Sequence, residues 1–209
     1  VGWSAAIAAA GDGRWRLALR LLGGMRAARA DPGAAAYSAA MSMCQRSLRW
    51  RHALHLLEQS FAGAVQPDIV MYSAAVCAVE HSRDWEGALR LLAQMEDGQL
   101  APNAIMFTSL ISACGSGRAW QDALSLFSRA VSAREITIDR PLHLAALGAC
   151  ASSTQWPTAL ELLSSVQRCS GLVPGSAMCN VAVAACAAAG RWPAVLDLLR
   201  LMRAAAVAA

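Results

Sequence analysis

Six tryptophans recur along the chain at a nearly constant spacing. Trp15, Trp50, Trp85, Trp120, Trp156 and Trp192 are separated by 35, 35, 35, 36 and 36 residues. Each begins the same phrase, Trp-x-x-Ala/Val-Leu-x-Leu-Leu/Phe. A period of about 20 to 50 residues is typical of proteins built by stacking copies of one small unit. The fold of this chain should therefore follow from the fold of its repeat.

Each unit is predicted to be a helix-turn-helix hairpin. In the third unit, apolar residues fall twice at i, i+3, i+4 and i+7, which indicates one face of each of two α-helices. The first stripe consists of Tyr72, Ala75, Val76 and Val79. The second consists of Trp85, Ala88, Leu89 and Leu92, and Leu91 and Met95 widen its face. Polar residues at 81–84 predict a turn between the helices. Gly98 and Pro102 predict the end of the second helix.

A single hairpin leaves an apolar face exposed, so several hairpins must stack before the array is stable. We expect an all-α protein, a right-handed α-solenoid superhelix of about six helix-turn-helix repeats in one array. The repeats are placed at residues 1–33, 34–68, 69–103, 104–139, 140–175 and 176–209. The chain begins inside the first repeat, with Trp3 at the aromatic position, and without Met. We therefore expect it to be a segment of a longer array.

Residue types exclude several functional classes. The sequence has no Lys, and so no phosphate-binding Gly-Lys-Ser/Thr loop, and Gly-x-Ser-x-Gly is also absent. The most apolar run, 177–190, is shorter than the roughly 18 residues of a membrane span. Four cysteines, Cys44, Cys114, Cys150 and Cys186, share one position on the first helix and are predicted to be buried core rather than metal ligands. We predict no enzyme, no cofactor, no membrane partner and no small-molecule substrate.

The units resemble pentatricopeptide repeats, the helical hairpins of organellar RNA-binding proteins. The resemblance rests on the period, on Ala-Leu early in the second helix, and on short motifs in successive units. These motifs are Pro67-Asp68 and Pro102-Asn103 at unit ends, and Tyr37-Ser38, Tyr72-Ser73 and Phe107-Thr108 in the first helices. The nearest competitor, the tetratricopeptide repeat, has a period of about 34 and carries its Trp in the first helix. The resemblance implies single-stranded RNA as partner and a chloroplast or mitochondrial location.

Stacked hairpins repeat the same positions along one groove, where single-stranded bases can be contacted one per repeat. In the family, the residue after the aromatic and the residue ending the unit contact the base edge. Carried over, the resemblance implies these base-recognition pairs: Ser38 with Asp68, Ser73 with Asn103, and Thr108 with Asp139. It also implies Val70 and Ile105 as residues flanking the base, and the sequence 5′-GAG-3′ for the central repeats. Arg46, in a first helix, is a candidate phosphate contact.

Two alternatives stay open at this point. Asp68, Asn103 and Asp139 are also ordinary residues for a helix cap, and hydroxyls near a helix start often bond the backbone. A helical-hairpin array can instead serve as a protein-interaction scaffold. Most of the 18 Arg residues fall in second helices or loops, where they form a solvated face. The fifth repeat has Leu144 and Gly175 at the pair positions, so base choice is expected to be absent there.

Overall fold

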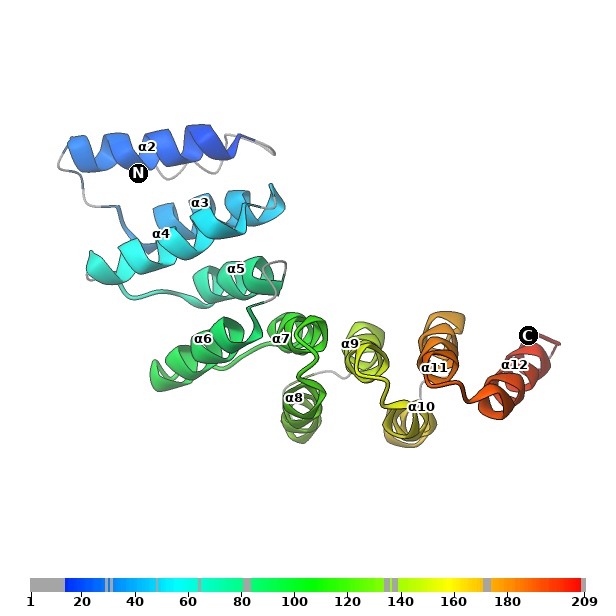
Figure 1. Cartoon of the computed structure of the whole chain (residues 1–209). Helices are drawn as coiled ribbons and strands as arrows, with labels where there is room; N and C mark the ends of the chain where they lie inside the picture. The colour runs from blue at the N-terminus through cyan, green and yellow to red at the C-terminus, as the bar shows by residue number, and fades with distance from the viewer. Residues whose placement is uncertain are drawn as a thin grey trace. The chain divides into compact units, whose positions relative to one another are not determined.

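The computed structural model describes residues 14–28, 30, 32–47, 49–63, 65–80, 84–133, 136, 139–170 and 174–207. Side chains are described for these residues except 167–170, 201 and 204–207. Within this part of the chain, regular structure consists of eleven α-helices, labelled α2–α12, and contains no strand (Figure 1). The predicted all-α class is confirmed. Trp3 and the first helix expected for the first repeat lie outside the described residues.

Helices alternate between two kinds, in the order that the repeat predicts. The first helices of the hairpins are α3 (Ala34–Arg46), α5 (Ile69–Glu80), α7 (Ala104–Ser116), α9 (Arg140–Ser152) and α11 (Ser176–Ala188). The second helices are α2 (Trp15–Ala27), α4 (Trp50–Ala62), α6 (Trp85–Asp97), α8 (Trp120–Ser132), α10 (Trp156–Ser170) and α12 (Trp192–Val207). Each of the six periodic tryptophans is the first residue of a second helix, as the sequence pattern predicts.

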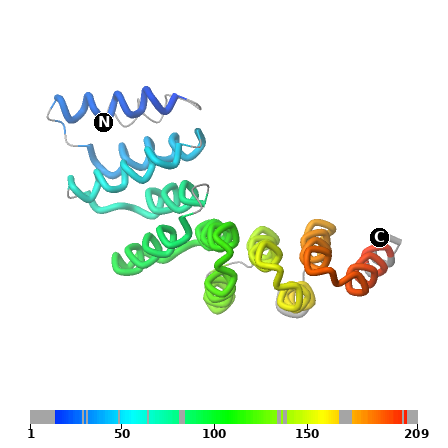
Figure 2. Tube along the Cα trace, in the orientation of Figure 1, coloured from blue at the N-terminus to red at the C-terminus, as the bar shows by residue number. Residues whose placement is uncertain are grey.

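The chain forms two compact units, which meet in the sequence at the predicted boundary between the third and fourth repeats. The first unit comprises residues 1–102, and the second comprises residues 103–209. In the first unit, α3 packs against α2, α4 and α5, and α5 packs against α4 and α6. In the second unit, α9 packs against its neighbours α7 and α11, and each first helix packs against its own second helix (Figure 2). Neighbouring repeats in each unit are therefore joined through their first helices.

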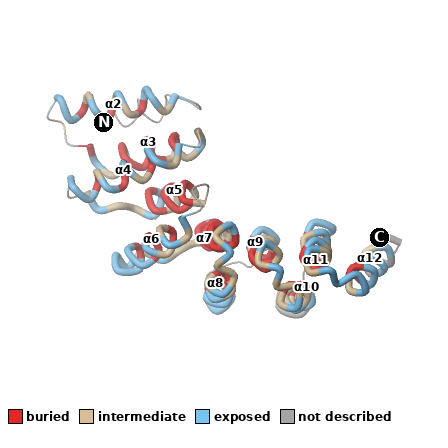
Figure 3. Tube along the Cα trace, in the orientation of Figure 1, coloured by how far each residue is buried: buried red, intermediate tan, exposed pale blue. Residues whose placement is uncertain are grey.

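First and second helices differ in how much of their surface they bury (Figure 3). The first helix α5 buries Met71, Tyr72, Ala74, Ala75, Val76, Ala78 and Val79. The second helix α6 buries one stripe, namely Ala88, Leu91, Leu92 and Met95. All four buried residues belong to the predicted face of α6, whereas Trp85 and Leu89, also predicted, are only half-buried. First helices lie between neighbours on several sides, whereas second helices face solvent on their outer side.

The shared cysteine position lies in the core at the end of the first helices. Burial raises the pKa of the Cys44 and Cys114 thiols to about 11. The side chains at all four positions are fully buried, which confirms the core prediction: Cys44, Cys114, Cys150 and Cys186. Among the described residues, no three His, Cys, Asp or Glu side chains are grouped to hold a metal ion. None of the described helices combines the length and apolar character that a membrane crossing requires.

The same cysteine residues also end the first helices through their carbonyl groups. The backbone N–H of Gln155 donates to the carbonyl of Cys150 at 2.9 Å, and Arg191 donates to Cys186 at the same distance. The residue inside each of these turns is left-handed, with φ of 56° at Thr154 and 68° at Gly190. This arrangement satisfies helix carbonyls that would otherwise lack partners. The turn has the same length in each of these repeats, so the next tryptophan always follows the cysteine by the same number of residues.

Two first helices of the second unit approach each other closely at Gly115 of α7 and Ala149 of α9. A β-carbon on Gly115 would lie 2.9 Å from Cα of Ala149, closer than side chains pack. The Ser152 hydroxyl on α9 lies 2.7 Å from the Gly115 carbonyl, to which it can donate. Glycine is thus required here by the contact between repeats.

Candidate nucleic-acid interface

The residue before a first helix caps that helix in three successive repeats. Oδ1 of Asp68 accepts a hydrogen bond from the Met71 N–H at 2.8 Å. Asn103 caps α7 through the Met106 N–H at 2.9 Å, and Asp139 caps α9 through the Leu142 N–H at 3.1 Å. The capping interpretation of Asp68, Asn103 and Asp139 is therefore correct. A cap occupies one oxygen and leaves the rest of the side chain available for other contacts.

Ser38 and Asp68 lie side by side. Ser38 is the fifth residue of α3, and its hydroxyl oxygen is 2.8 Å from Oδ2 of Asp68. The same oxygen is 2.8 Å from the carbonyl of Ala34, so its single proton can serve only one of these acceptors at a time. Ser38 is only 9% exposed, while Asp68 is half-buried. The structure thus brings together the first predicted pair, with Asp68 as its more accessible member.

The third predicted pair lies entirely in the second unit. Thr108 is the fifth residue of α7, and its hydroxyl donates to the Ala104 carbonyl at 2.8 Å. Asp139 is exposed at the start of α9, which packs against α7. In the described part of the chain, no hydrogen bond joins Thr108 to Asp139. This pair therefore occupies the positions of Ser38 and Asp68 without their direct contact.

The second predicted pair divides between the two compact units. Ser73 is half-buried on α5 in the first unit, and Asn103 is half-buried at the start of the second. Their pairing stays a prediction. The fifth residue of α9 is Leu144, which is half-buried and packs against the core of the second unit. As the sequence indicates, that repeat offers no polar group at this position.

The two residues expected to flank a base are exposed. Val70 is 46% exposed as the second residue of α5, and Ile105 is 64% exposed as the second residue of α7. The equivalent residues of the other first helices, Ala35, Pro141 and Ala177, are exposed as well. Each first helix therefore presents its second residue to solvent, and in two repeats that residue is a large aliphatic one.

The aromatic residue before each fifth position is buried and holds the helix start in place. Tyr37, Tyr72 and Phe107 are each at most 4% exposed. In α9, His143 occupies the same place, where Nδ1 lies 3.0 Å from the Asp139 carbonyl and the ring packs edge-on against Phe127. His143 is therefore a core residue rather than a catalytic one. In α11 the same place is occupied by the half-buried Cys179, so an aromatic or imidazole ring stands there in four of the five described first helices.

Arg46 lies at the opposite end of α3 from Ser38. It is the exposed last residue of the helix, and eight residues of helix correspond to about 12 Å. A basic residue in the last turn also complements the helix dipole. The structure does not bring Arg46 together with the predicted pairs, and its contact with phosphate stays a prediction.

The described geometry is a series of helical hairpins of similar length, three of which have a side-chain cap at the start of the first helix. A family model described as a pentatricopeptide repeat domain matches residues 55–117, and a second, for the single repeat, matches residues 105–134. Residues 55–134 of this chain are therefore pentatricopeptide repeats. The matched residues contain the whole third repeat, with the predicted pair Ser73 and Asn103, and parts of the second and fourth repeats. No curated protein sequence is significantly similar to the chain.

Solved pentatricopeptide repeat structures share the fold of this chain. The protein PPR10 in complex with an 18-nucleotide psaJ RNA element matches with a TM-score of 0.77 and 15% identity, over 96% of this chain and 29% of that one. PPR10 from maize matches with a TM-score of 0.64 and 21% identity, over 94% and 28%. The pentatricopeptide repeat domain of Arabidopsis thaliana protein-only RNase P 1 in complex with tRNA matches with a TM-score of 0.67 and 16% identity, over 79% and 86%. This chain thus spans less than a third of the PPR10 chains.

One recurring contact between pentatricopeptide repeats was not expected from the sequence. The guanidinium carbon of Arg49 lies 5.1 Å from the ring centre of Trp15, and that of Arg191 lies 4.5 Å from the ring centre of Trp156. Each arginine directly precedes the tryptophan of the following repeat. The Arg-Trp dipeptide occurs at three of the periodic tryptophans, Trp15, Trp50 and Trp192, and in the last two the arginine lies over the tryptophan of the preceding repeat. The role of this arginine depends on the position of the neighbouring repeat, which the sequence alone does not give.

Proposed function

We propose that this chain binds single-stranded RNA along the starts of its first helices, with one base facing each repeat. The contact between Ser38 and Asp68 carries the proposal, because it sets the fifth residue of one first helix against the residue preceding the next. The family assignment supports it, as does the similarity to PPR10 and RNase P 1, both in complexes with RNA. The family also supports a role in RNA metabolism in a chloroplast or mitochondrion.

The capping residues are the groups that we assign to base recognition. A carboxylate only accepts hydrogen bonds, and each oxygen keeps a lone pair after one bond has formed. Asp68 and Asp139 can therefore accept the N–H groups of a guanine edge. Asn103 differs because its Oδ1 is used by the cap and its amide nitrogen carries two donors. A donor at this position favours adenine, so the proposed central sequence is GAG.

Ser38 acts in this proposal mainly by orienting Asp68. It is nearly buried, and its hydroxyl is within hydrogen-bonding distance of the carboxylate. The exposed side chains of Val70 and Ile105 supply apolar surface on which a base ring can pack. We take this packing and the contacts to the base edge together as about 1 to 3 kcal/mol per base, the range known for bases stacked on aromatic side chains. Three such repeats give a gross gain of about 3 to 9 kcal/mol, which corresponds to roughly millimolar to submicromolar binding.

The experiment compares two labelled oligonucleotides that carry GAG or GGG at the centre. The unaltered chain should prefer GAG, and Asn103→Asp should reverse that preference by about tenfold, equivalent to about 1.4 kcal/mol. Asp84→Asn is the matched control, because Asp84 caps the second helix α6 through the Gly87 N–H. The control should leave the preference unchanged. An identical ratio for Asn103→Asp and the unaltered chain would overturn the base assignment.

A protein-interaction scaffold is the second candidate function, and the open pocket beside Trp120 described below favours it. The salt dependence of binding distinguishes the two candidate functions. Binding of single-stranded RNA should weaken with salt, with a log-log slope of about −0.7 for each phosphate neutralised. Binding of a protein through a pocket should depend on salt far less.

A further inference from the structure

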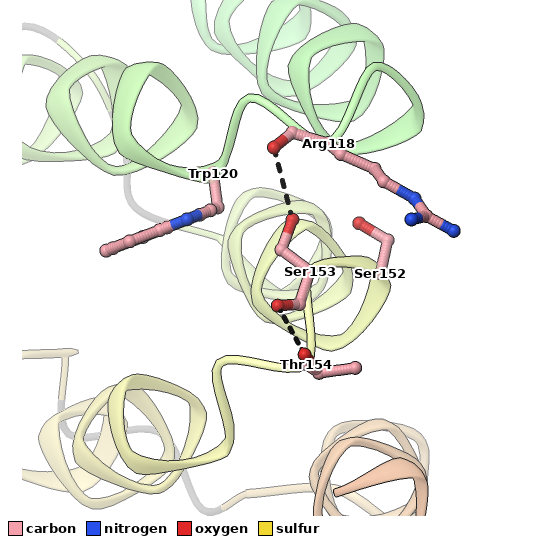
Figure 4. A pocket seen from close by; sticks show the side chains of 5 residues that line it. All are labelled: Arg118, Trp120, Ser152, Ser153 and Thr154. Carbon is pink, nitrogen blue, oxygen red and sulfur yellow. Dashed lines mark hydrogen bonds between the residues drawn. The ribbon is translucent and has the colours of Figure 1, made fainter.

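An open pocket lies in the second unit at the turns that follow α7 and α9. We call it the turn pocket; its lining residues are Arg118, Trp120, Ser152, Ser153 and Thr154, and its volume is about 300 Å³ (Figure 4). Arg118 follows the end of α7, ten residues after Thr108, which corresponds to about 15 Å of helix. The turn pocket is therefore distinct from the proposed RNA-binding positions at the start of the same helix.

In two other pairs of repeats, the space over the tryptophan is occupied by an arginine of the chain. Arg191 directly precedes Trp192 and lies over Trp156, and Arg49 bears the same relationship to Trp15. Before Trp156 the corresponding residue is Gln155. Among the described residues, no arginine lies over the Trp120 ring. The turn pocket thus includes Trp120, whose counterparts Trp15 and Trp156 each contact a guanidinium group of the following repeat.

Hydrogen bonding in the turn pocket favours a ligand that donates. The Ser153 hydroxyl donates to the Arg118 carbonyl at 3.3 Å, and the Thr154 hydroxyl donates to the Ser153 carbonyl at 2.8 Å. The Ser152 hydroxyl lies within bonding distance of the Gly115 and Ala149 carbonyls. Each hydroxyl has one proton and two lone pairs, so these three groups can only accept from a ligand. Figure 4 shows the hydroxyls on the side of the pocket across from the Trp120 indole.

We propose that the turn pocket binds the guanidinium group of an arginine on a partner protein. A guanidinium is flat, carries five N–H donors and stacks on an indole face, which matches both Trp120 and the acceptor hydroxyls. A lysine ammonium lacks the flat face. The positive charge of Arg118 opposes such a ligand, but Figure 4 shows its guanidinium directed away from Trp120. Replacing Arg118 by a neutral residue should therefore strengthen binding.

The probe is N-acetyl-arginine methylamide, added to the intact 209-residue chain while the Trp120 indole N–H is followed by NMR. The arginine probe should bind at least about threefold more tightly than the lysine analogue, because only the guanidinium stacks. Gln155→Arg should reduce binding by about tenfold or more, since the new side chain fills the pocket from within. Arg118→Gln should strengthen binding by about twofold to threefold as the like charge is removed.

Arg191→Gln is the matched variant that uncovers Trp156 without supplying acceptor hydroxyls, because Ala188, Ala189 and Gly190 stand where Ser152, Ser153 and Thr154 line the turn pocket. The Trp156 indole N–H of this variant should therefore respond to the probe more weakly than the Trp120 indole N–H. Trp120→Ala is less informative, because loss of a repeat tryptophan can unfold the array. The proposal is overturned if Gln155→Arg binds the probe as well as the unaltered chain does. It is also overturned if adenosine monophosphate perturbs Trp120 more than the arginine probe, which would indicate a site for RNA bases.

Discussion

Ser38 and Asp68 are thirty residues apart in the chain, yet their side-chain oxygens lie 2.8 Å apart. The carboxylate of Asp68 thereby connects two repeats, because its other oxygen caps α5. A residue that ends one repeat and starts the next helix can bond both neighbours only if successive first helices pack side by side. The same contact is therefore evidence for the stacking of repeats and for the location of the proposed base-recognition positions.

Ser38→Ala should lower the free energy of unfolding by about 1 kcal/mol, because one oxygen of the half-buried carboxylate loses its partner. The measurement is urea denaturation followed by circular dichroism. RNA affinity should fall as well, since Asp68 is no longer oriented. Ser125→Ala is the control, because the exposed Ser125 hydroxyl bonds only the Asp122 carbonyl of its own helix. Equal effects of the two substitutions would contradict the role given to Ser38.

Gly115→Ala should destabilise the second unit by about 1 to 3 kcal/mol, the usual effect of overpacking a close contact. The added methyl group would meet the backbone of Ala149 at 2.9 Å. Gly148→Ala is a matched control one residue away from Ala149 on α9. A β-carbon on Gly148 would meet nothing within 4 Å, so this substitution should stabilise the helix by about 0.5 to 1 kcal/mol. The contact is refuted if the midpoints of thermal unfolding of the two variants shift in the same direction.

Thr154→Gly should stabilise the chain by about 0.5 to 1 kcal/mol. Thr154 has φ of 56°, where a β-branched side chain is strained, and the next repeat has Gly190 at the same place with φ of 68°. Glycine removes the strain but adds entropy to the unfolded chain, which limits the gain. The reciprocal change, Gly190→Thr, should lower the thermal midpoint. The prediction fails if Thr154→Gly unfolds at a lower temperature than the unaltered chain.

Stability should decrease at high pH because of the buried cysteines. Burial raises the pKa of the Cys44 and Cys114 thiols from 9.0 to about 11. The unfolded chain then loses these protons at lower pH than the folded chain, so unfolding becomes easier as the pH rises from about 9 toward 11. Denaturant titrations at pH 7, 9 and 10.5 measure the decrease. Cys114→Ala should show a shallower pH dependence above pH 9 than the unaltered chain.

Local features were predictable because they depend on short stretches of sequence. The tryptophan period and the apolar stripes predicted the helix pairs, and Trp85 begins α6 as expected. The cap positions followed from residue type, since Asp and Asn before an apolar run favour a helix start. Details of side-chain direction were less predictable. Of the six residues predicted on the buried face of α6, Leu91 and Met95 are more fully buried than Trp85 and Leu89, because packing against α5 sets the rotation of the helix.

The sequence by itself determined the repeat, the length and order of the helices, and the positions at which polar residues recur. These follow from periodicity and from the preferences of individual residues, which act over a few turns of helix. Only the tertiary structure decided which recurring positions meet across repeats, as Ser38 meets Asp68 and Arg191 covers Trp156. Such contacts depend on the distance and rotation between packed helices. The distance and the rotation are set by side chains that lie thirty or more positions apart in the chain. The sequence of a single repeat therefore does not determine them.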